Sequence, residues 1–383
     1  MRLFVLLLFF LLTLNSCAPA QADDVMTLFA LNVGKADALL LHYDDMTYLI
    51  DTGSEESWGT LSRALAMLEI DHLDGVIITH TDKDHIGGVP MLAASSIEVD
   101  AWYASRYFAD VKESKHPVLL AAQGRGQHVL WLSAGDALPF GDGSLSVLAP
   151  ARGSDEENDN SVILLAEGAG GRMLLMGDAE LPAERALMKA HPDLPRCQVL
   201  KVGHHGGDDA TSAKLLLQVQ PAVAVISTST GVREDTPAAS VLQRLWQAGA
   251  EVAVTQDCEA GVVITLENGR ASMELTDWAE LPPPAAGVRL AGKDNNDDII
   301  IIFNASTEAV DLSGWYLQSE RGGEIYFFPQ GTSLAPETSL TLGTLSSDQP
   351  LDLLWHEKNV WHNKKDDAAL LFDAYGREID TFK

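Results

Sequence analysis

Short apolar segments alternate with amphipathic segments from residue 26 to about residue 275. The apolar segments are rich in Val, Ile, Leu and Ala, and their length is typical of buried strands; they cover residues 47–50, 75–79, 172–176, 199–202 and 222–226. Three stretches between them carry apolar residues three and four positions apart, without internal Pro or Gly, so we predict helices at 61–68, 183–190 and 238–248. This alternation predicts an α/β domain in which helices cover the faces of a sheet.

A proline-rich stretch separates this region from the rest of the chain. Residues 281–287 read Leu-Pro-Pro-Pro-Ala-Ala-Gly, a sequence that forms neither a helix nor a central strand. We therefore predict a linker there, between one domain at 23–280 and a second at 288–383. The first clear strand beyond the linker is predicted at 299–303, and the short strands and Gly, Asn and Ser turns that follow predict an all-β domain.

The N-terminal 22 residues have the pattern of an export signal. An apolar run at 3–14 follows Arg2 and is too short for a permanent membrane span. The run ends in Leu-Asn-Ser-Cys, which resembles the bacterial lipobox, so we expect a lipoprotein of the bacterial envelope anchored only through lipid on Cys17. The alternative is plain secretion after cleavage at one of the Ala-x-Ala sites at 18–20 and 20–22.

Composition narrows the function further. The 383 residues suit two domains, and 26 Lys and Arg against 55 Asp and Glu give a net charge of −29, which disfavours non-specific binding of DNA by the protein surface. Bound metal ions could still supply local positive charge for a phosphodiester substrate. Only three cysteines occur, which excludes a disulfide framework and leaves open one bridge between Cys197 and Cys258.

One loop carries a dense set of potential metal ligands. The segment after the strand at 75–79 reads His-Thr-Asp-Lys-Asp-His and contains His80, Asp82, Asp84 and His85. Carboxylates crowded at the end of a buried strand repel one another unless a cation neutralises them. In an extended segment, residues two apart point the same way and adjacent residues diverge, so this one loop could supply ligands to two neighbouring metal ions.

This H-x-D-x-D-H segment resembles the metal-binding motif of the metallo-β-lactamase fold, with Asp82 where the commoner form has His. With Gly87 and Gly88 following, it is similar to the hydrolase domain of ComEC-type competence proteins. The resemblance implies a four-layer αββα domain. Segment 32–38 is similar to the family's V-G-Q-G-D-A motif, with Lys and Ala replacing Gln and the second Gly. Segment 48–53 resembles the family's strand that ends in D-x-G. The resemblance implies that Asp51 contacts the ring nitrogen of a metal-ligating histidine that does not face the metal.

Three more segments agree with this resemblance. Segments 158–164 and 174–180 resemble two family motifs, which implies that Asp178 bridges two metal ions and that Asn160 and Ser161 support the ligands from behind. The alternative is a purely structural role, in which Asp178 only caps the helix that follows it.

Segment 200–207 is similar to the family motif L-K-x-x-H-H-G-S, with Gly207 in place of Ser, and this similarity implies a supporting role for Lys201. Where the family carries a His before Pro237, this chain has Thr236.

One of the adjacent residues His204 and His205 should be the last metal ligand. Neighbouring side chains at a strand end point in opposite directions, so both do not easily bind the same ion. We predict His204 as the ligand and His205, together with Asp84, as a catalytic residue that contacts the oxyanion or the leaving group. The histidines outside these motifs, His116 among them, have no partners at ligand spacing, and we expect most of them at the surface.

The chemistry implied is hydrolysis at two divalent metal ions. Two ions about 4 Å apart would share a bridging hydroxide as the nucleophile. Zinc is the default, and the exchange of His for Asp82 makes manganese or iron plausible as well. We expect an exported phosphodiesterase or nuclease that acts on single-stranded DNA or another phosphodiester. The alternatives are a metallohydrolase of another ester, a lactone or a lactam, and a non-catalytic, envelope-tethered binding protein.

The C-terminal region resembles a second family. The segments 311–317, 326–329, 334–336 and 360–363 together resemble the lamin-tail domain, an immunoglobulin-like β-sandwich. A module of this kind could dock an envelope component or a protein partner. We expect Trp315, Trp355 and Trp361 to form its core rather than a binding surface.

Overall fold

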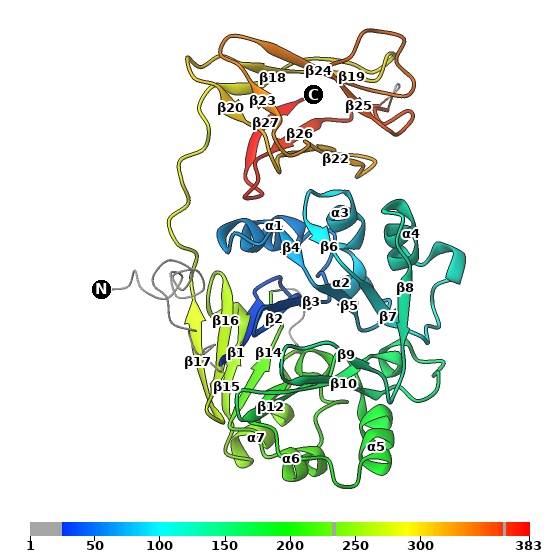
Figure 1. Ribbon diagram of the computed structural model, residues 1–383, viewed down its shortest axis with the longest axis vertical. Helices are drawn as coiled ribbons and strands as arrows, with labels where there is room; N and C mark the ends of the chain where they lie inside the picture. The colour runs from blue at the N-terminus through cyan, green and yellow to red at the C-terminus, as the bar shows by residue number, and fades with distance from the viewer. Residues whose placement is uncertain (1–24, 232–234, 363–364) are drawn as a thin grey trace. The chain divides into compact units, whose positions relative to one another are not determined.

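The computed structural model describes residues 25–231, 235–362 and 365–383 (Figure 1). The predicted signal peptide and Cys17 lie outside these residues. The chain forms two compact units, of which the first holds most of residues 25–279 and the second all of residues 280–383. No helix in the described part of the chain has the length and apolar character that a membrane crossing requires.

The first unit contains an eight-stranded mixed sheet, which we call sheet one. Its strand order is β17-β16-β1-β2-β3-β5-β7-β8. The four strands from β3 to β8 are parallel, and the others pair antiparallel. The bounds are β1 (Val25–Leu31), β2 (Leu39–Tyr43), β3 (Met46–Ile50), β5 (Gly75–Ile78), β7 (Trp102–Ser105), β8 (Val129–Leu132), β16 (Gly261–Glu267) and β17 (Arg270–Thr276).

A seven-stranded sheet, sheet two, has the order β15-β14-β13-β12-β11-β10-β9. Its strands from β12 to β15 are parallel, so their carboxyl ends meet at one edge. The bounds are β9 (Ala137–Leu138), β10 (Ser144–Ala149), β11 (Ile163–Gly168), β12 (Gly171–Leu175), β13 (Val199–Lys201), β14 (Val223–Ile226) and β15 (Glu251–Val254). The two-residue strands β4 (His72–Leu73) and β6 (Glu98–Val99) pair separately.

An apolar core joins the two sheets face to face. It takes Leu28 and Leu41 from sheet one and Leu164 and Val225 from sheet two, all of them fully buried. The outer face of sheet two is covered by α5 (Leu181–Ala190), α6 (Ala213–Val219) and α7 (Ala239–Gln247) in a second apolar cluster, and α4 (Pro117–Gly124) packs on β7 and β8. The predicted four-layer αββα fold is confirmed. The remaining helices are α1 (Trp58–Met67), α2 (Lys83–Ile86), α3 (Val89–Ala94) and the 3-10 turns η1 (Glu113–Lys115), η2 (Glu157–Asn160), η3 (His204–Gly206) and η4 (Thr255–Asp257).

The second unit is all-β, as predicted. Two four-stranded sheets, ordered β18-β19-β24-β25 and β22-β21-β26-β27, and the pair β20-β23 enclose one apolar core. Trp315, Trp355 and Trp361 lie in that core, as expected. The bounds are β18 (Val288–Asp294), β19 (Ile299–Asn304), β20 (Val310–Asp311), β21 (Tyr316–Ser319), β22 (Ile325–Phe327), β23 (Ser333–Leu334), β24 (Ser339–Thr344), β25 (Leu353–Trp355), β26 (Ala369–Phe372) and β27 (Glu378–Phe382).

Three local expectations are corrected. The first strand after the linker begins at Val288 rather than at Ile299, because Val288 and Leu290 are buried against β19. Cys197 and Cys258 are both free and buried, so the bridge left open between them does not form. His116 is buried at the start of α4, where its ring packs edge-on against Phe108 and Trp131.

Candidate metal centre

The ligand-rich loop leaves β5 and turns into the short helix α2. His80 and His85 are buried, whereas the side chains of Asp82 and Asp84 are 39% and 30% exposed. The loop is held by its backbone, because the carbonyl oxygen of His85 accepts a hydrogen bond from the N–H of Thr52 at 2.7 Å. A Cβ at Gly88 would collide with the carbonyl oxygen of Thr52, so the glycine permits this close approach. The glycine at position 88 thus allows the ligand-rich loop to pack closely against the backbone at Thr52.

Sheet two brings the other ligand candidates to the same place. Asp178 follows β12, and its Oδ2 lies 3.2 Å from Nε2 of His85 and 3.1 Å from Nε2 of His205, which follows β13. Nε2 of His205 also lies 3.4 Å from Oδ2 of Asp84. The rings of His80 and His85 have centroids 4.1 Å apart. The predicted meeting of distant segments therefore takes place at the carboxyl ends of strands from both sheets.

The donor set fits divalent cations. Nε2 of His80 and Oδ1 of Asp178 are buried without any hydrogen-bond partner, and buried polar atoms are rarely left in that state. Ligand atoms from His80, His85 and Asp178 lie within 4.8 Å of one another, and the same holds for Asp84, His85 and His205. Imidazole nitrogen and carboxylate oxygen are the ligands that zinc and similar metals prefer. Two adjacent ligand groups thus share His85 at the junction of the sheets.

The charges within this cluster are strongly coupled. Burial works against the charged form of Asp178, but the nearby His205 and His85 outweigh it and hold the pKa of Asp178 well below its usual value. Burial likewise opposes a charge on His205, yet Asp178 and Asp84 raise its pKa to about 9. Burial and the neighbouring His85 lower the pKa of His80 well below its ordinary value. Against the effect of burial, Asp178 and Asp51 likewise raise the pKa of His85 well above its usual value, so the carboxylates favour the protonated forms of both histidines.

Residues behind the cluster orient its histidines. Oδ2 of Asp51 lies 2.8 Å from Nδ1 of His85, in agreement with the supporting role predicted for Asp51. The hydroxyl of Ser161 lies 3.4 Å from Nδ1 of His80 and accepts a hydrogen bond from the N–H of Asp178 at 3.0 Å. Asn160 has a different place: its Oδ1 accepts a hydrogen bond from the N–H of Ser154, so it shapes the neighbouring loop instead of contacting a ligand. The contacts of Asp51 and Ser161 are made to Nδ1 of the two rings, so Nε2 of His85 and of His80 is directed into the cluster.

A buried ion pair lies beneath the histidines. Nζ of Lys201 is 2.7 Å from Oδ2 of Asp37, and both side chains are almost completely buried. The carboxylate of Asp37 is also 4.0 Å from Nδ1 of His85 and 4.0 Å from Nδ1 of His205. Lys201 was predicted to support the site, but Asp37 was not counted among the site residues. Its signal was the V-G-x-x-D-A segment, in which Asp37 occupies the Asp position.

Glu157 is a second residue that sequence reasoning missed. Its Oε1 accepts hydrogen bonds from the N–H and the hydroxyl of Thr81 at 2.8 and 2.6 Å, and its Oε2 accepts one from the N–H of Ala109. Glu157 therefore holds the loop between His80 and Asp82 in place. No local sequence signal marks it, since its partner is 76 residues away.

The two adjacent histidines have exchanged their expected places. His205 is fully buried in the cluster, whereas His204 is 21% exposed and its Nδ1 contacts Oδ1 of Asp209 at 2.8 Å. Both residues have left-handed backbone conformations in the η3 turn, with φ of 44° and 51°, and this turn separates their rings. The structure therefore places His205 in the cluster, and not His204, which was the predicted ligand. Thr236 stands where the resembled motif has His, and its hydroxyl forms a hydrogen bond with the hydroxyl of Thr228 at 2.7 Å.

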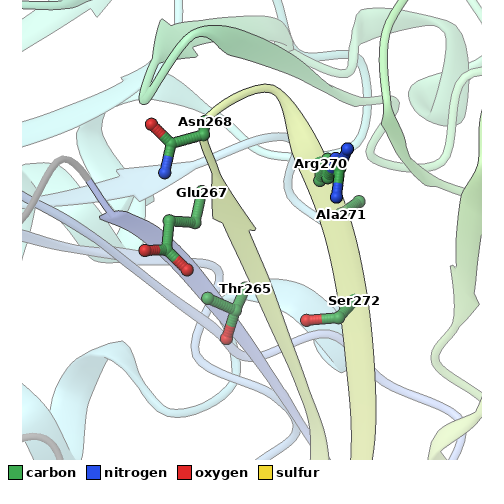
Figure 2. A pocket seen from close by; sticks show the side chains of 6 residues that line it. All are labelled: Thr265, Glu267, Asn268, Arg270, Ala271 and Ser272. Atoms are coloured by element: carbon green, nitrogen blue, oxygen red, sulfur yellow. The ribbon is translucent and has the colours of Figure 1, made fainter.

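A surface hollow elsewhere in this unit does not match the chemistry of the cluster. It has a volume of about 430 Å³ and lies along the β16–β17 hairpin, lined by Thr265, Glu267, Asn268, Arg270, Ala271 and Ser272 (Figure 2). The hairpin turn approaches Gly170, which precedes β12, whereas Asp178 follows that strand. The hollow therefore lies at the opposite end of β12 from the histidines and contains none of the ligand candidates.

Comparison with known families agrees with this geometry. The model of the Metallo-beta-lactamase superfamily matches residues 31–230, which include every residue of the cluster. The chain belongs to the metallo-beta-lactamase superfamily. The model of the Lamin Tail Domain matches residues 287–383, which confirms the resemblance of the second unit. Membership in the superfamily implies a hydrolase fold that binds divalent metal.

Curated relatives narrow the placement within the superfamily. The chain is 30% identical over 255 residues to ComE operon protein 3 of Bacillus subtilis, covering 62% of this chain and 32% of that protein. It is 30% identical over 220 residues to Recombination protein 2 of Haemophilus influenzae, covering 56% of this chain and 26% of that protein. The chain thus spans about a third or less of these relatives. Among solved structures, the metallo-beta-lactamase fold protein YhfI of Bacillus subtilis is similar over 63% of this chain and 99% of its own, with 12% identity and a TM-score of 0.39.

Proposed function

We propose that this protein is a metal-dependent phosphodiesterase that works with two divalent cations. The observation that carries the proposal is that the buried side chains of His80, His85, Asp178 and His205 meet in one cluster. Within it, Nε2 of His80 and Oδ1 of Asp178 have no hydrogen-bond partner. When bound, such cations would ionise a water molecule near neutral pH and stabilise charge on the attacked group.

The residues divide into two ligand groups. His80, Asp82 and Asp178 would hold the first cation, since Nε2 of His80 lies 3.8 Å from Oδ2 of Asp82. Asp84, His85 and His205 would hold the second, with Asp178 bordering both. Mixed nitrogen and oxygen ligands suit zinc, and the carboxylate-rich first group also suits manganese or iron. Asp51, Ser161 and Glu157 keep these side chains oriented, so the ligands are in position before substrate arrives.

Two considerations bear on the substrate. The curated relatives are named as competence and recombination proteins, which favours a nucleic acid, and single-stranded DNA is the form we propose. The net charge of −29 works against extended contact with a polyanion, so the cations would provide most of the local attraction for a phosphate group. A short or terminal phosphodiester needs attraction only at the cations, so it fits a negatively charged protein better than a long duplex does.

The decisive experiment combines metal analysis with a substrate panel. Purified protein, with its metal content measured, is incubated with single-stranded DNA, with bis-p-nitrophenyl phosphate and with a set of lactones; Asp84→Ala is the control. Hydrolysis of the phosphodiesters that is lost in the control supports the proposal. Hydrolysis of lactones alone would indicate a metallohydrolase that acts on another class of ester. Bound metal without turnover of any substrate would indicate a binding protein.

We further propose that the protein is exported and carries lipid on Cys17, and that its lamin-tail domain docks an envelope or protein partner. The support for export is the apolar run at 3–14 followed by Leu-Asn-Ser-Cys. Mass spectrometry of the mature N-terminus from a bacterial host tests this proposal: a lipid-modified Cys17 supports it, whereas an unmodified terminus beyond residue 17 indicates plain secretion.

A further inference from the structure

The helices α6 and α7 expose large apolar side chains on the outer face of sheet two (Figure 1). Leu217 on α6 is 74% exposed, Trp246 on α7 is 78% exposed, and Leu242 is exposed one turn before Trp246. The two helices contact each other, and a groove of about 290 Å³ between them is lined partly by Leu217. We call Leu217, Leu242 and Trp246 the α6–α7 patch. Exposed apolar side chains gathered on two adjacent short helices are typical of an interaction surface.

The charge of these two helices is opposite in sign to that of the whole chain. They contain no Asp or Glu, and their charged residues are Lys214 and Arg244, whereas the chain has a net charge of −29. Apolar side chains that include Trp, together with basic residues and no acidic ones, are typical of helices that lie on a lipid surface. Trp is favoured at the level of the headgroups, and Lys and Arg are attracted by anionic lipids. The composition of α6 and α7 therefore fits a membrane surface.

The patch lies at the end of the first unit where β1 begins. The start of β1, at Val25, pairs with the end of β16, and Leu266 of β16 approaches Gly171, the first residue of β12. Because β12 to β15 are parallel neighbours in register, their amino ends share this edge. α6 leads into β14 and α7 leads into β15, so the last turns of both helices lie at the same edge. Leu217 and Trp246 belong to these last turns.

The proposed lipid anchor is attached to the chain near this edge. Seven residues, 18–24, lie between Cys17 and Val25, so the extended reach from one to the other is about 28 Å at most. Packed sheets lie about 10 Å apart, and a helix with its side chains is about 10 Å across. The distance from β1 across sheet two to the outer side of α6 and α7 is thus within this reach. A membrane that holds a lipid on Cys17 can therefore contact the α6–α7 patch at the same time.

We propose that the α6–α7 patch rests on the lipid surface of the bacterial envelope, with Leu217 and Trp246 inserted among the headgroups; this proposal rests on the lipid anchor proposed above and not on the substrate. The positive charges of Lys214 and Arg244 favour anionic headgroups. Asp178 follows the carboxyl end of β12, whereas the patch lies at the amino ends of the strands. Docking through the patch therefore directs the metal centre away from the lipid.

Vesicle binding by a form without the anchor tests the surface directly. Residues 23–383, the product of Ala-x-Ala cleavage, keep every described residue and lack Cys17. This chain is sedimented with vesicles of phosphatidylglycerol and phosphatidylethanolamine. We expect Leu217→Gln/Trp246→Gln to lower the partition coefficient about tenfold or more. The matched control is Leu120→Gln/Leu130→Gln, whose leucines are about half exposed on α4 and β8, and it should bind as the wild type does.

Fluorescence quenching locates the contact without relying on loss of binding. Brominated lipids in the vesicles should quench part of the Trp emission of the wild type, and Trp246→Phe should lack this quenched part. Absence of vesicle binding by the wild type, equal losses in both double variants, or quenching that persists in Trp246→Phe would each overturn the proposal.

The docking surface and the anchor can fail separately. An unmodified N-terminus in mass spectrometry, together with vesicle binding that depends on the patch, would remove the anchor and leave the docking surface standing. A lipid on Cys17, together with vesicle binding that is insensitive to the patch, would keep the anchor and refute the docking surface. Self-association that depends on the patch, without binding to vesicles, would assign the patch to a second copy of the chain and also refute the proposal.

Discussion

Asp51 connects His85 of the candidate metal centre to Thr79 at the end of strand β5. Oδ2 of Asp51 lies 2.8 Å from Nδ1 of His85, while both oxygens of Asp51 also accept hydrogen bonds from Thr79, from its N–H at 2.8 Å and from its hydroxyl at 2.7 Å. The ring is thereby fixed with Nε2 directed at Asp178. Burial raises the pKa of Asp51, and the neighbouring His85 opposes that rise.

Asp51→Asn should weaken metal binding without unfolding the protein. Replacing the carboxylate that orients a ligating histidine typically lowers metal affinity by about 10- to 100-fold. Affinity is measured by competition with a chromophoric chelator. Asp74→Asn is the control, since Asp74 accepts a backbone hydrogen bond from Thr47 in the same sheet and contacts no ligand candidate. Equal affinities in wild type and Asp51→Asn would show that the contact does not support the ligand.

Removal of metal should lower the melting temperature. A cation held between Asp178 and His85 would fasten sheet two to sheet one, and a ligand at 100 times its Kd stabilises the folded state by about 2.7 kcal/mol. Thermal unfolding with added zinc and with a chelator checks this expectation. The difference should disappear in Asp178→Asn, and its persistence there would place the stabilising cation elsewhere.

The buried His116 should make stability depend on pH. Burial lowers its pKa from 6.5 to about 4, so its contribution to stability is complete above pH 6.5 and is lost as the pH falls toward 4. His116→Phe keeps a ring between Phe108 and Trp131 but does not titrate. Between pH 7.5 and 4.5, the free energy of unfolding should fall more in the wild type than in the variant, by on the order of 2 kcal/mol. Parallel curves in urea titrations would contradict this.

Trp361→Ala should destabilise the lamin-tail domain alone. Trp361 is 2% exposed, and its ring packs edge-on against Trp355. The centroid of the ring lies 5.2 Å from Nζ of Lys293. Truncation of such a residue costs roughly 3–5 kcal/mol. Denaturation followed by fluorescence should show an earlier transition, with metal content unchanged. The control is Leu354→Ala, a half-exposed neighbour for which a change below about 1 kcal/mol is expected.

The sequence allowed the fold to be predicted because its local signals agree with one another. The apolar stretch at 199–202 and the helical spacing at 183–190 both correspond to observed elements, β13 and α5. The density of His and Asp residues in one loop also sufficed to locate the cluster that forms the candidate metal centre. The ordered motifs then indicated that Asp178 and a histidine after β13 would join it.

The details that the sequence did not reveal depend on backbone angles and on distant partners. His204 was preferred over His205 because a strand end was assumed, and the observed left-handed turn reverses which ring points inward. Glu157 and Asp37 were missed because their roles come from tertiary contacts with Thr81 and Lys201. His116 looked like a surface residue because the aromatic rings that enclose it are 8 and 15 positions away in the sequence.

The buried lysine beneath the cluster also sets a limit on what the site can hold. Asp37, Asp51, Asp82, Asp84 and Asp178 carry five formal negative charges around it, while Lys201 pairs with Asp37 and Lys35 lies 3.6 Å from Asp84. The carboxylates outnumber the lysines, and excess negative charge in a medium of low polarity favours the entry of divalent rather than monovalent cations. A lysine that never meets solvent thus helps to set how much positive charge this centre still attracts.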